Sequence, residues 1–304
     1  MPHMEGFEQQ RFAVWFANAN CNMTCDYCWQ HDEPLPANYG RAATARSLKT
    51  LRPGHPVGLE YDAILQSWLN AWGKLKPTIL DITGGEPLIL PWMVDFIAQI
   101  PLQKVAITTN MTGDLAGMIR KVPPEKVAVI TASWHPTQKL SLEDFTGKCL
   151  MMKQRGFPVN INFVTWPEQV HMLDYYREWF QRFGLFFHVD PFAVADAKAA
   201  RAIIPTRSER DLVSANVDVD RQVHPWTEKY GSNYQVRCDA GIRHFCVQPN
   251  GDVWRCLTFF VHKLPPMGNL FDDDFELPTE KLPCSLHHVC AGCDRDKVLV
   301  ELIS

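Results

Sequence analysis

The sequence of 304 residues lacks the features that mark membrane, secreted or nucleic-acid-binding proteins. No run approaches the roughly 20 consecutive apolar residues that cross a bilayer. The N-terminal residues, Met1-Pro-His-Met-Glu-Gly-Phe-Glu, contain neither the basic nor the apolar segment of a secretory signal. The net charge is −4 and no block of like charges occurs, which argues against nucleic acid or an anionic membrane surface as a partner. We therefore expect a cytoplasmic protein, and the balanced charge is consistent with a small-molecule or short-peptide substrate.

Cysteine, by contrast, is plentiful, with ten residues in the chain. In the reducing cytoplasm this number favours metal or redox chemistry over disulfides. The cysteines are Cys21, Cys25 and Cys28 near the start, Cys149 alone, and Cys238, Cys246, Cys256, Cys284, Cys290 and Cys293 near the end. Two separate cysteine-based sites are therefore expected, one in each part of the chain.

Strand-like apolar runs alternate with segments of helical spacing over the first two thirds of the chain. The expected strands are 11–18, 78–83, 104–109, 126–132, 159–164 and 185–189, and the expected helices are 61–72, 91–99, 112–121, 141–154 and 168–183. Such alternation predicts an α/β fold with right-handed βαβ units and a parallel sheet of six strands. Residues 32–58 have no clear period and are interpreted as a loop insertion.

The most informative stretch follows the first expected strand and places Cys21, Cys25 and Cys28 in a CxxxCxxC pattern. Three thiolates on one loop offer a metal cluster three ligands and leave one position open for a substrate molecule. Taken alone, the spacing also fits half of a zinc knuckle. The residues that follow along the chain favour the open cluster.

With Tyr27 just before the third cysteine, this loop resembles the cluster loop of the radical S-adenosylmethionine (SAM) enzymes. The resemblance implies that Cys21, Cys25 and Cys28 hold a 4Fe-4S cluster whose fourth iron chelates SAM. It also implies cleavage of SAM to a 5'-deoxyadenosyl radical, with an electron donor such as flavodoxin or ferredoxin. The fold that it implies is a partial (β/α)6 barrel related to the TIM barrel.

A second motif, Gly84-Gly85-Glu86, stands at the end of the second expected strand, where barrel enzymes place their sites. Two glycines let the backbone approach a ligand, and a carboxylate can accept hydrogen bonds from an ammonium group. The segment matches the GGE motif of the same family, which contacts the SAM amino group. A tight βα turn without a ligand is the alternative.

Polar residues at the ends of the following strands complete the expected SAM site. Asn110 and Ser133 end the third and fourth strands, and Asn162 alternates with apolar neighbours on the fifth. The resemblance implies that such groups bind the ribose and carboxylate of SAM, while ordinary turn chemistry is the alternative for the first two. His135, beside the same mouth, is a candidate catalytic residue, although a lone histidine is more often structural.

The C-terminal cysteines resemble the auxiliary-cluster domain called SPASM, in its shortened form, twitch. Twelve residues separate Cys238 from Gly251, and four further residues separate Gly251 from Cys256. The resemblance implies one auxiliary 4Fe-4S cluster with the ligands Cys238, Cys256, Cys290 and Cys293. A structural zinc site is the alternative, and Cys284 could replace one of the four.

These motifs divide the chain into a barrel at residues 1–190, a linker with one helix (207–217) at 191–235, and a small cysteine-rich α+β domain at 236–304. We expect hydrogen-atom abstraction from a small polar substrate such as a sugar or aminocyclitol, followed by oxidation with the auxiliary cluster as electron acceptor. No leader-peptide-binding module precedes the barrel in this sequence, which favours a small molecule.

Two alternatives stay open. One is an epimerase or cross-linking enzyme acting on a peptide or a sugar, with Cys246 as a candidate hydrogen donor. The other is a non-catalytic zinc-binding protein on the same barrel.

Overall fold

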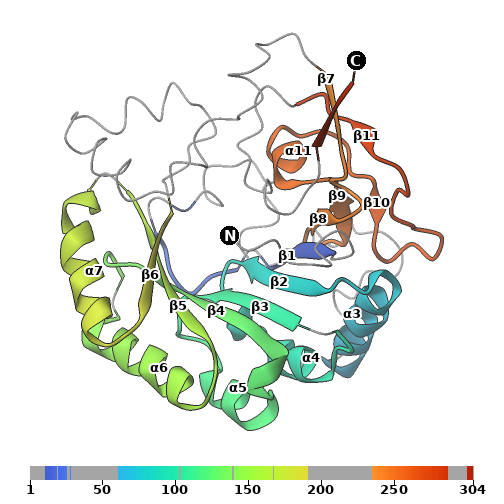
Figure 1. Ribbon diagram of the computed structural model, residues 1–304. Helices are drawn as coiled ribbons and strands as arrows, with labels where there is room; N and C mark the ends of the chain where they lie inside the picture. Colours follow the sequence, from blue (N-terminus) through green and yellow to red (C-terminus); the bar gives the residue numbers. More distant parts are fainter. Residues whose placement is uncertain are drawn as a thin grey trace.

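A curved sheet with helices along its outer face forms the body of the protein in the computed structural model (Figure 1). The structure describes residues 11–18, 20–25, 28, 61–102, 104–138, 140–166, 168–190, 235–286 and 300–303. Tyr27, Cys290, Cys293, the expected loop 32–58 and the expected helix 207–217 lie outside these residues. Within the described ranges, no helix has the length and apolar character needed to cross a bilayer.

The first six strands are parallel and adjacent in chain order, as the alternating pattern predicts. They are β1 (Phe12–Asn18), β2 (Ile79–Gly84), β3 (Lys104–Thr109), β4 (Val127–Trp134), β5 (Val159–Val164) and β6 (Phe186–Asp190). Because parallel strands end at the same edge, the segments that follow them meet there. This edge carries the cysteine motif and the Gly-Gly-Glu motif.

The helices between these strands pack on one face of the sheet, as both ribbon views show. They are α3 (Tyr61–Leu75), α4 (Met93–Gln99), α5 (Leu115–Lys121), α6 (Leu142–Gln154) and α7 (Leu173–Arg182), with short 3-10 turns η2 (Pro87–Ile89), η3 (Pro124–Lys126) and η4 (Val170–Met172). Ser141 caps α6 as expected, since its side chain accepts a hydrogen bond from the Asp144 amide at 3.1 Å. Helix α3 runs past Gly73, where the sequence suggests its end, and Lys76 adopts the positive φ of 44° beyond it.

Aromatic side chains fill the layer between the sheet and the helices. The Trp15 ring on β1 lies 4.5 Å from Trp68 on α3 and 5.0 Å from Phe96 on α4, measured between centroids. Trp134 on β4 lies 5.1 Å from Phe145 on α6. Since side chains alternate along a strand, the neighbours of Trp15 and Trp134 face the inner side of the sheet.

The sheet does not stop at β1. Strand β8 (His244–Val247) pairs with β1 in parallel, and β9 (Asp252–Trp254) and β10 (Gly268–Asn269) continue the sheet in antiparallel pairs. The resulting nine-stranded sheet crosses the division at residue 236 that the sequence suggests, while the domain boundaries themselves stay a prediction.

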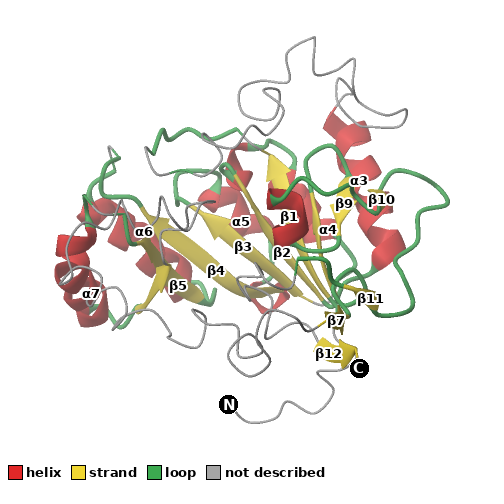
Figure 2. Ribbon diagram, turned by 90° about the horizontal axis from the view of Figure 1, so that it is seen from above, coloured by secondary structure: helices red, strands yellow, loops and turns green. Residues whose placement is uncertain are grey.

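A second sheet of three strands, β11 (Leu282–Pro283), β7 (Gln235–Cys238) and β12 (Val300–Ile303), lies at one end of the large sheet (Figure 2). The short helix α11 (Leu257–Val261) follows β9. Strands and a helix in this region agree with the mixed α+β character that the sequence predicts.

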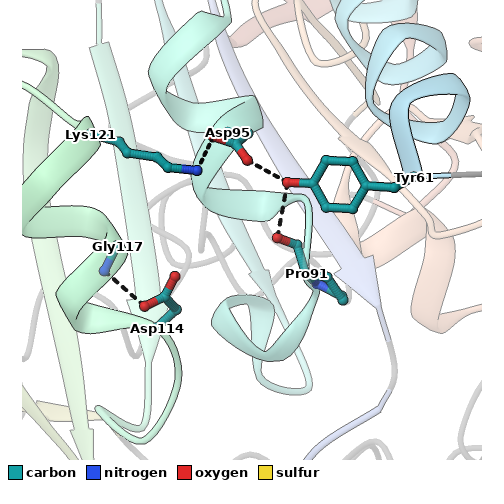
Figure 3. Close-up of polar contacts among 6 residues, drawn as sticks. All are labelled: Tyr61, Pro91, Asp95, Asp114, Gly117 and Lys121. Atoms are coloured by element: carbon teal, nitrogen blue, oxygen red, sulfur yellow. Dashed lines mark hydrogen bonds and ion pairs between the residues drawn. The ribbon is translucent and has the colours of Figure 1, made fainter.

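A polar contact joins three of the outer helices (Figure 3). The Tyr61 hydroxyl of α3 donates to the Asp95 carboxylate of α4 and to the Pro91 carbonyl at 3.2 Å. Lys121 of α5 donates to the same carboxylate at 2.6 Å. The hydrogen bonds from Lys121 and the Tyr61 hydroxyl lower the pKa of Asp95. The pKa of Tyr61 is raised to about 12, mainly by burial and also by the nearby Asp95 carboxylate.

Candidate active site at the carboxyl ends of the strands

The cysteine motif forms the loop directly after β1, as the sequence predicts. Cys21 is exposed, Cys28 is half-buried and Cys25 is buried. The Cys28 amide donates to the Cys25 carbonyl at 3.0 Å, which turns the backbone between the two thiols. Three thiols therefore lie on one short loop at the edge where the six parallel strands end.

The Gly-Gly-Glu motif holds this loop through the backbone. The Gly85 amide donates to the Asn18 carbonyl and the Glu86 amide to the Asn20 carbonyl, both at 2.9 Å. Gly84 has a φ of 133°, and a Cβ atom there would lie 2.3 Å from the Asn18 oxygen. Glycine is required at this position because the β1 and β2 ends approach too closely for any side chain.

The Glu86 carboxylate forms hydrogen bonds within the protein, and its expected contact with SAM stays a prediction. It is 0% exposed and accepts hydrogen bonds from the Leu88 amide at 3.0 Å, the Thr109 hydroxyl at 2.8 Å and the Asn110 amide at 2.6 Å. Burial raises the pKa of this carboxyl, and the three donors act in the opposite direction. The carboxylate thus joins the end of β2 to the end of β3, so a ligand would meet the backbone of this motif.

Asn110 connects the end of β3 to the cysteine loop. Its side-chain nitrogen, Nδ2, donates to the Asn22 side-chain oxygen at 2.9 Å and lies 3.8 Å from the Cys21 sulfur. Its side-chain oxygen accepts from the Thr112 amide at 3.0 Å. Burial is the main cause of the raised pKa of the Cys21 thiol, whereas the hydrogen bonds that the sulfur accepts act to lower this pKa. Asn110 is therefore placed beside the first expected cluster ligand.

Ser133 and Asn162 lie side by side on the inner face of the sheet. They are register partners on β4 and β5, and Asn162 is also paired with His188 on β6. Both Ser133 and Asn162 are buried, and the Asn162 side-chain oxygen has no hydrogen-bond partner among the residues that the structure describes. His188 Nε2 lies 3.1 Å from the Asp190 carboxylate. A row of polar groups therefore crosses three strands near their carboxyl ends.

The two candidate catalytic residues, His135 and Cys246, lie in different parts of the sheet. His135 follows β4 at the same edge, and burial lowers its pKa to about 4, which leaves it neutral at pH 7. Cys246 on β8 is the register partner of Val14 and 0% exposed. Alternation from Trp15 places Val14, and with it Cys246, on the inner side of the sheet. Its role as a hydrogen donor stays a prediction.

Three of the C-terminal cysteines, Cys238, Cys256 and Cys284, lie near the buried side chain of Arg255. Cys238 and Cys256 pack with Ala240 in a small buried cluster. The Cys238 thiol accepts a hydrogen bond from Cys284, which together with Arg255 lowers its pKa. Cys284 is held there because its amide donates to the Val236 carbonyl at 2.8 Å.

Two features of the site bear on metal binding. In the described part of the chain, no three His, Cys, Asp or Glu side chains lie close enough to share a single metal ion. A zinc ion draws its thiolates to about 2.3 Å, whereas an iron–sulfur cluster spreads them over four irons. The full set of C-terminal ligands includes Cys290 and Cys293, which lie outside the described residues.

Solved structures with the same fold include SuiB from Streptococcus suis bound to the precursor peptide SuiA, with a TM-score of 0.57 and 13% identity over 88% of this chain and 63% of that chain. Another is anSMEcpe with bound AdoMet and the Cp18Cys peptide, with a TM-score of 0.53 and 15% identity over 86% of this chain and 77% of that one. This chain shares the fold of these structures, and the CxxxCxxC motif of Cys21, Cys25 and Cys28 adds its resemblance to the radical SAM enzymes.

One curated protein is similar to this chain in sequence. The chain is 29% identical over 127 residues to a 7-carboxy-7-deazaguanine synthase of Geobacter sulfurreducens. The match covers 36% of this chain and 49% of the relative, so it spans about half the length of that enzyme. No protein-family model matches the chain.

The sequence motifs do not predict three residues of these sites, Asn18, Asn22 and Arg255. Asn18 is buried at the end of β1, donates to the Glu86 carbonyl at 3.2 Å and has a side-chain oxygen without a partner. Asn22, inside the cysteine motif, also donates to Thr112 at 2.7 Å. Arg255 immediately precedes Cys256. Asn22 and Arg255 adjoin a cysteine in the sequence, and Asn18 precedes Cys21 by three positions, so proximity to a cysteine is the signal that could have identified them.

Proposed function

We propose that this protein is a radical SAM enzyme that binds a 4Fe-4S cluster through Cys21, Cys25 and Cys28 and cleaves SAM to start a hydrogen-atom abstraction. One observation carries the proposal: the three-cysteine loop, the Gly-Gly-Glu turn and Asn110 meet at one edge of the parallel sheet and are joined by hydrogen bonds. Known structures with this fold include SuiB bound to S-adenosylmethionine.

The residues present fit these two groups. Thiolates are the ligands that iron–sulfur clusters require, and three of them on one loop leave an iron free for SAM. The side-chain oxygens of Asn18 and Asn162 are buried without partners, which is costly unless a ligand donates to them. Gly85 has no side chain, so the backbone just after the β2 end can approach a ligand closely.

The cluster, when bound, would supply the electron that cleaves SAM, and the protein side chains would hold the cluster and SAM in place. Cys21, Cys25 and Cys28 hold the cluster at the strand ends. Ser133 and Asn162 present a hydroxyl and an amide from β4 and β5 to the SAM ribose or carboxylate. His135 is a candidate catalytic residue that presents a neutral imidazole at this edge, because burial lowers its pKa to about 4. The electron comes from a flavodoxin or ferredoxin.

The first candidate substrate is a small polar molecule such as a sugar or aminocyclitol. The inner face of the sheet supports this choice because, beside the expected SAM contacts, β6 presents the imidazole of His188 and the carboxylate of Asp190. The relative of 29% identity also carries the name of an enzyme with a small polar product. Cys238 and Cys256 would contribute ligands to an auxiliary cluster, which would supply an acceptor for one electron from the substrate radical.

A peptide substrate is the second candidate. The specific observation in its favour is that both SuiB and anSMEcpe have solved structures with bound peptides, precursor peptide SuiA and Cp18Cys. Epimerisation or cross-linking of a peptide would use the same SAM cleavage. Solvent deuterium appearing at one product carbon would favour epimerisation, and Cys246→Ala tests the hydrogen donor.

The decisive experiment is anaerobic reconstitution with iron and sulfide, followed by iron counting and a 5'-deoxyadenosine assay with SAM and dithionite. Wild type should bind about eight irons, and the Cys21/Cys25/Cys28→Ala variant about four, with loss of 5'-deoxyadenosine. Cys149→Ala is the matched control, since that thiol is buried in α6 away from both sites. Zinc in place of iron, or iron without SAM cleavage, would support the non-catalytic alternative and refute the proposal.

A further inference from the structure

Arg255 is a buried cation at the junction of β9 and α11, with only 4% of its surface exposed. Its Nε donates to the Ala240 carbonyl at 2.9 Å, and its Nη1 donates to the Pro283 carbonyl at 2.6 Å. Its Nη2 donates to the Cys238 carbonyl at 2.9 Å, to the Leu282 carbonyl, and to the Cys238 sulfur at 3.2 Å. One guanidinium therefore joins β7 to β11 and directs an N–H group at a cysteine sulfur.

The charge of Arg255 has no acidic partner among these contacts. In the described part of the chain, its hydrogen-bond partners are carbonyl oxygens and one sulfur, and no ion pair includes it. The Phe259 ring lies 5.3 Å from the guanidinium carbon, which adds a weak attraction only. Burying an unpaired cation is costly, so a negative charge is expected beside it.

An anionic cluster at Cys238 would supply that charge. Cys256 directly follows Arg255 and packs with Cys238 in the same buried cluster. A cluster held by thiolates carries net negative charge, and reduction by one electron increases it. Hydrogen bonds to sulfur, nearby charge and burial are the factors that set the reduction potential of such clusters. Arg255 contributes both a hydrogen bond to sulfur and a nearby positive charge.

We propose that Arg255 is a positioning residue that raises the reduction potential of the auxiliary cluster, by its N–H bond to Cys238 and by its buried charge. This inference rests on the proposed auxiliary cluster. In the step that it serves, the substrate radical gives one electron to the oxidised cluster and one proton to water. The cluster gains one electron, which then leaves to an oxidised flavodoxin or ferredoxin, so charge and electrons balance.

The test uses the full chain with Cys21, Cys25 and Cys28 replaced by alanine, because this variant retains the auxiliary cluster alone. Iron is counted after anaerobic reconstitution, and the midpoint potential is measured by a redox titration followed by electron paramagnetic resonance. Arg255→Gln removes the charge, and Arg255→Lys keeps the charge without the planar fork. Arg237→Gln is the matched control, since Arg237 is exposed on the same strand as Cys238.

Arg255→Gln should make reduction about tenfold less favourable, which is a shift of about 59 mV to more negative potential for one electron. Arg255→Lys should shift it less, and Arg237→Gln should leave it unchanged. An unshifted potential in Arg255→Gln overturns the proposal. Loss of iron from both Arg255 variants also overturns it, because the residue would then only support the fold. If the parent variant with Arg255 binds no iron, the proposed auxiliary cluster itself is wrong, and SAM cleavage by the wild type is judged separately.

Discussion

Replacing Glu86 by glutamine tests whether this carboxylate organises the active-site edge rather than binding a ligand. Glutamine has nearly the same shape, and its oxygen can still accept from the Leu88 amide and the Thr109 hydroxyl. Its amide group must then face the Asn110 amide, which lies 2.6 Å from the carboxylate in the wild type. One hydrogen bond to a charged acceptor is lost, and two donors oppose each other.

A hydrogen bond to a charged group contributes about 1.5–3 kcal/mol, and an unsatisfied buried donor costs about 1–3 kcal/mol. The two effects overlap, so Glu86→Gln should lower the free energy of unfolding by about 2–4 kcal/mol. Because Asn110 also contacts Asn22 and lies near Cys21, the affinity for the cluster should fall about 10–100-fold, as for other residues that orient metal ligands.

Unfolding of the apoprotein in urea under reductant gives the first quantity, and iron retention against a chelator gives the second. Glu143→Gln, at an exposed position on α6, is the control and should change neither. An unchanged urea midpoint for Glu86→Gln would refute the reasoning. Unchanged stability together with weaker SAM binding would instead mean that the carboxylate binds the ligand directly.

Three further substitutions probe other contacts. Tyr61→Phe removes the hydroxyl that joins α3 to Asp95, and urea unfolding should show a loss of about 1 kcal/mol. Since the folded pKa of Tyr61 is raised from 10 to about 12, wild-type stability should fall as pH rises through that window, and Tyr61→Phe should show a flatter alkaline limb. Gly84→Ala places a Cβ atom against the Asn18 oxygen and should cost about 3 kcal/mol; unchanged thermal unfolding would contradict the close approach. Asn162→Leu removes a buried acceptor without a partner, so stability should not fall while SAM affinity drops about tenfold in calorimetry; tight binding would remove Asn162 from the site.

Local signals in the sequence determined the parallel sheet and the place of its reactive edge. The expected strands 104–109 and 159–164 coincide with β3 and β5, and Ser141 caps α6. These signals are readable because periodicity and capping depend on residues a few positions apart. The CxxxCxxC spacing likewise placed Cys21 at a strand end and indicated the family, because all three thiols belong to one short stretch of the chain.

Only the tertiary structure decided which distant groups share that edge. The pairing of β8 with β1 brings Cys246 beside Val14, although the two strands come from opposite ends of the chain. The tertiary structure also brings the Glu86 carboxylate to the Asn110 backbone amide and the Arg255 guanidinium to the Cys238 sulfur. Such contacts form between segments that are far apart in the chain and meet only in the folded protein, so the local spacing of apolar residues does not predict them.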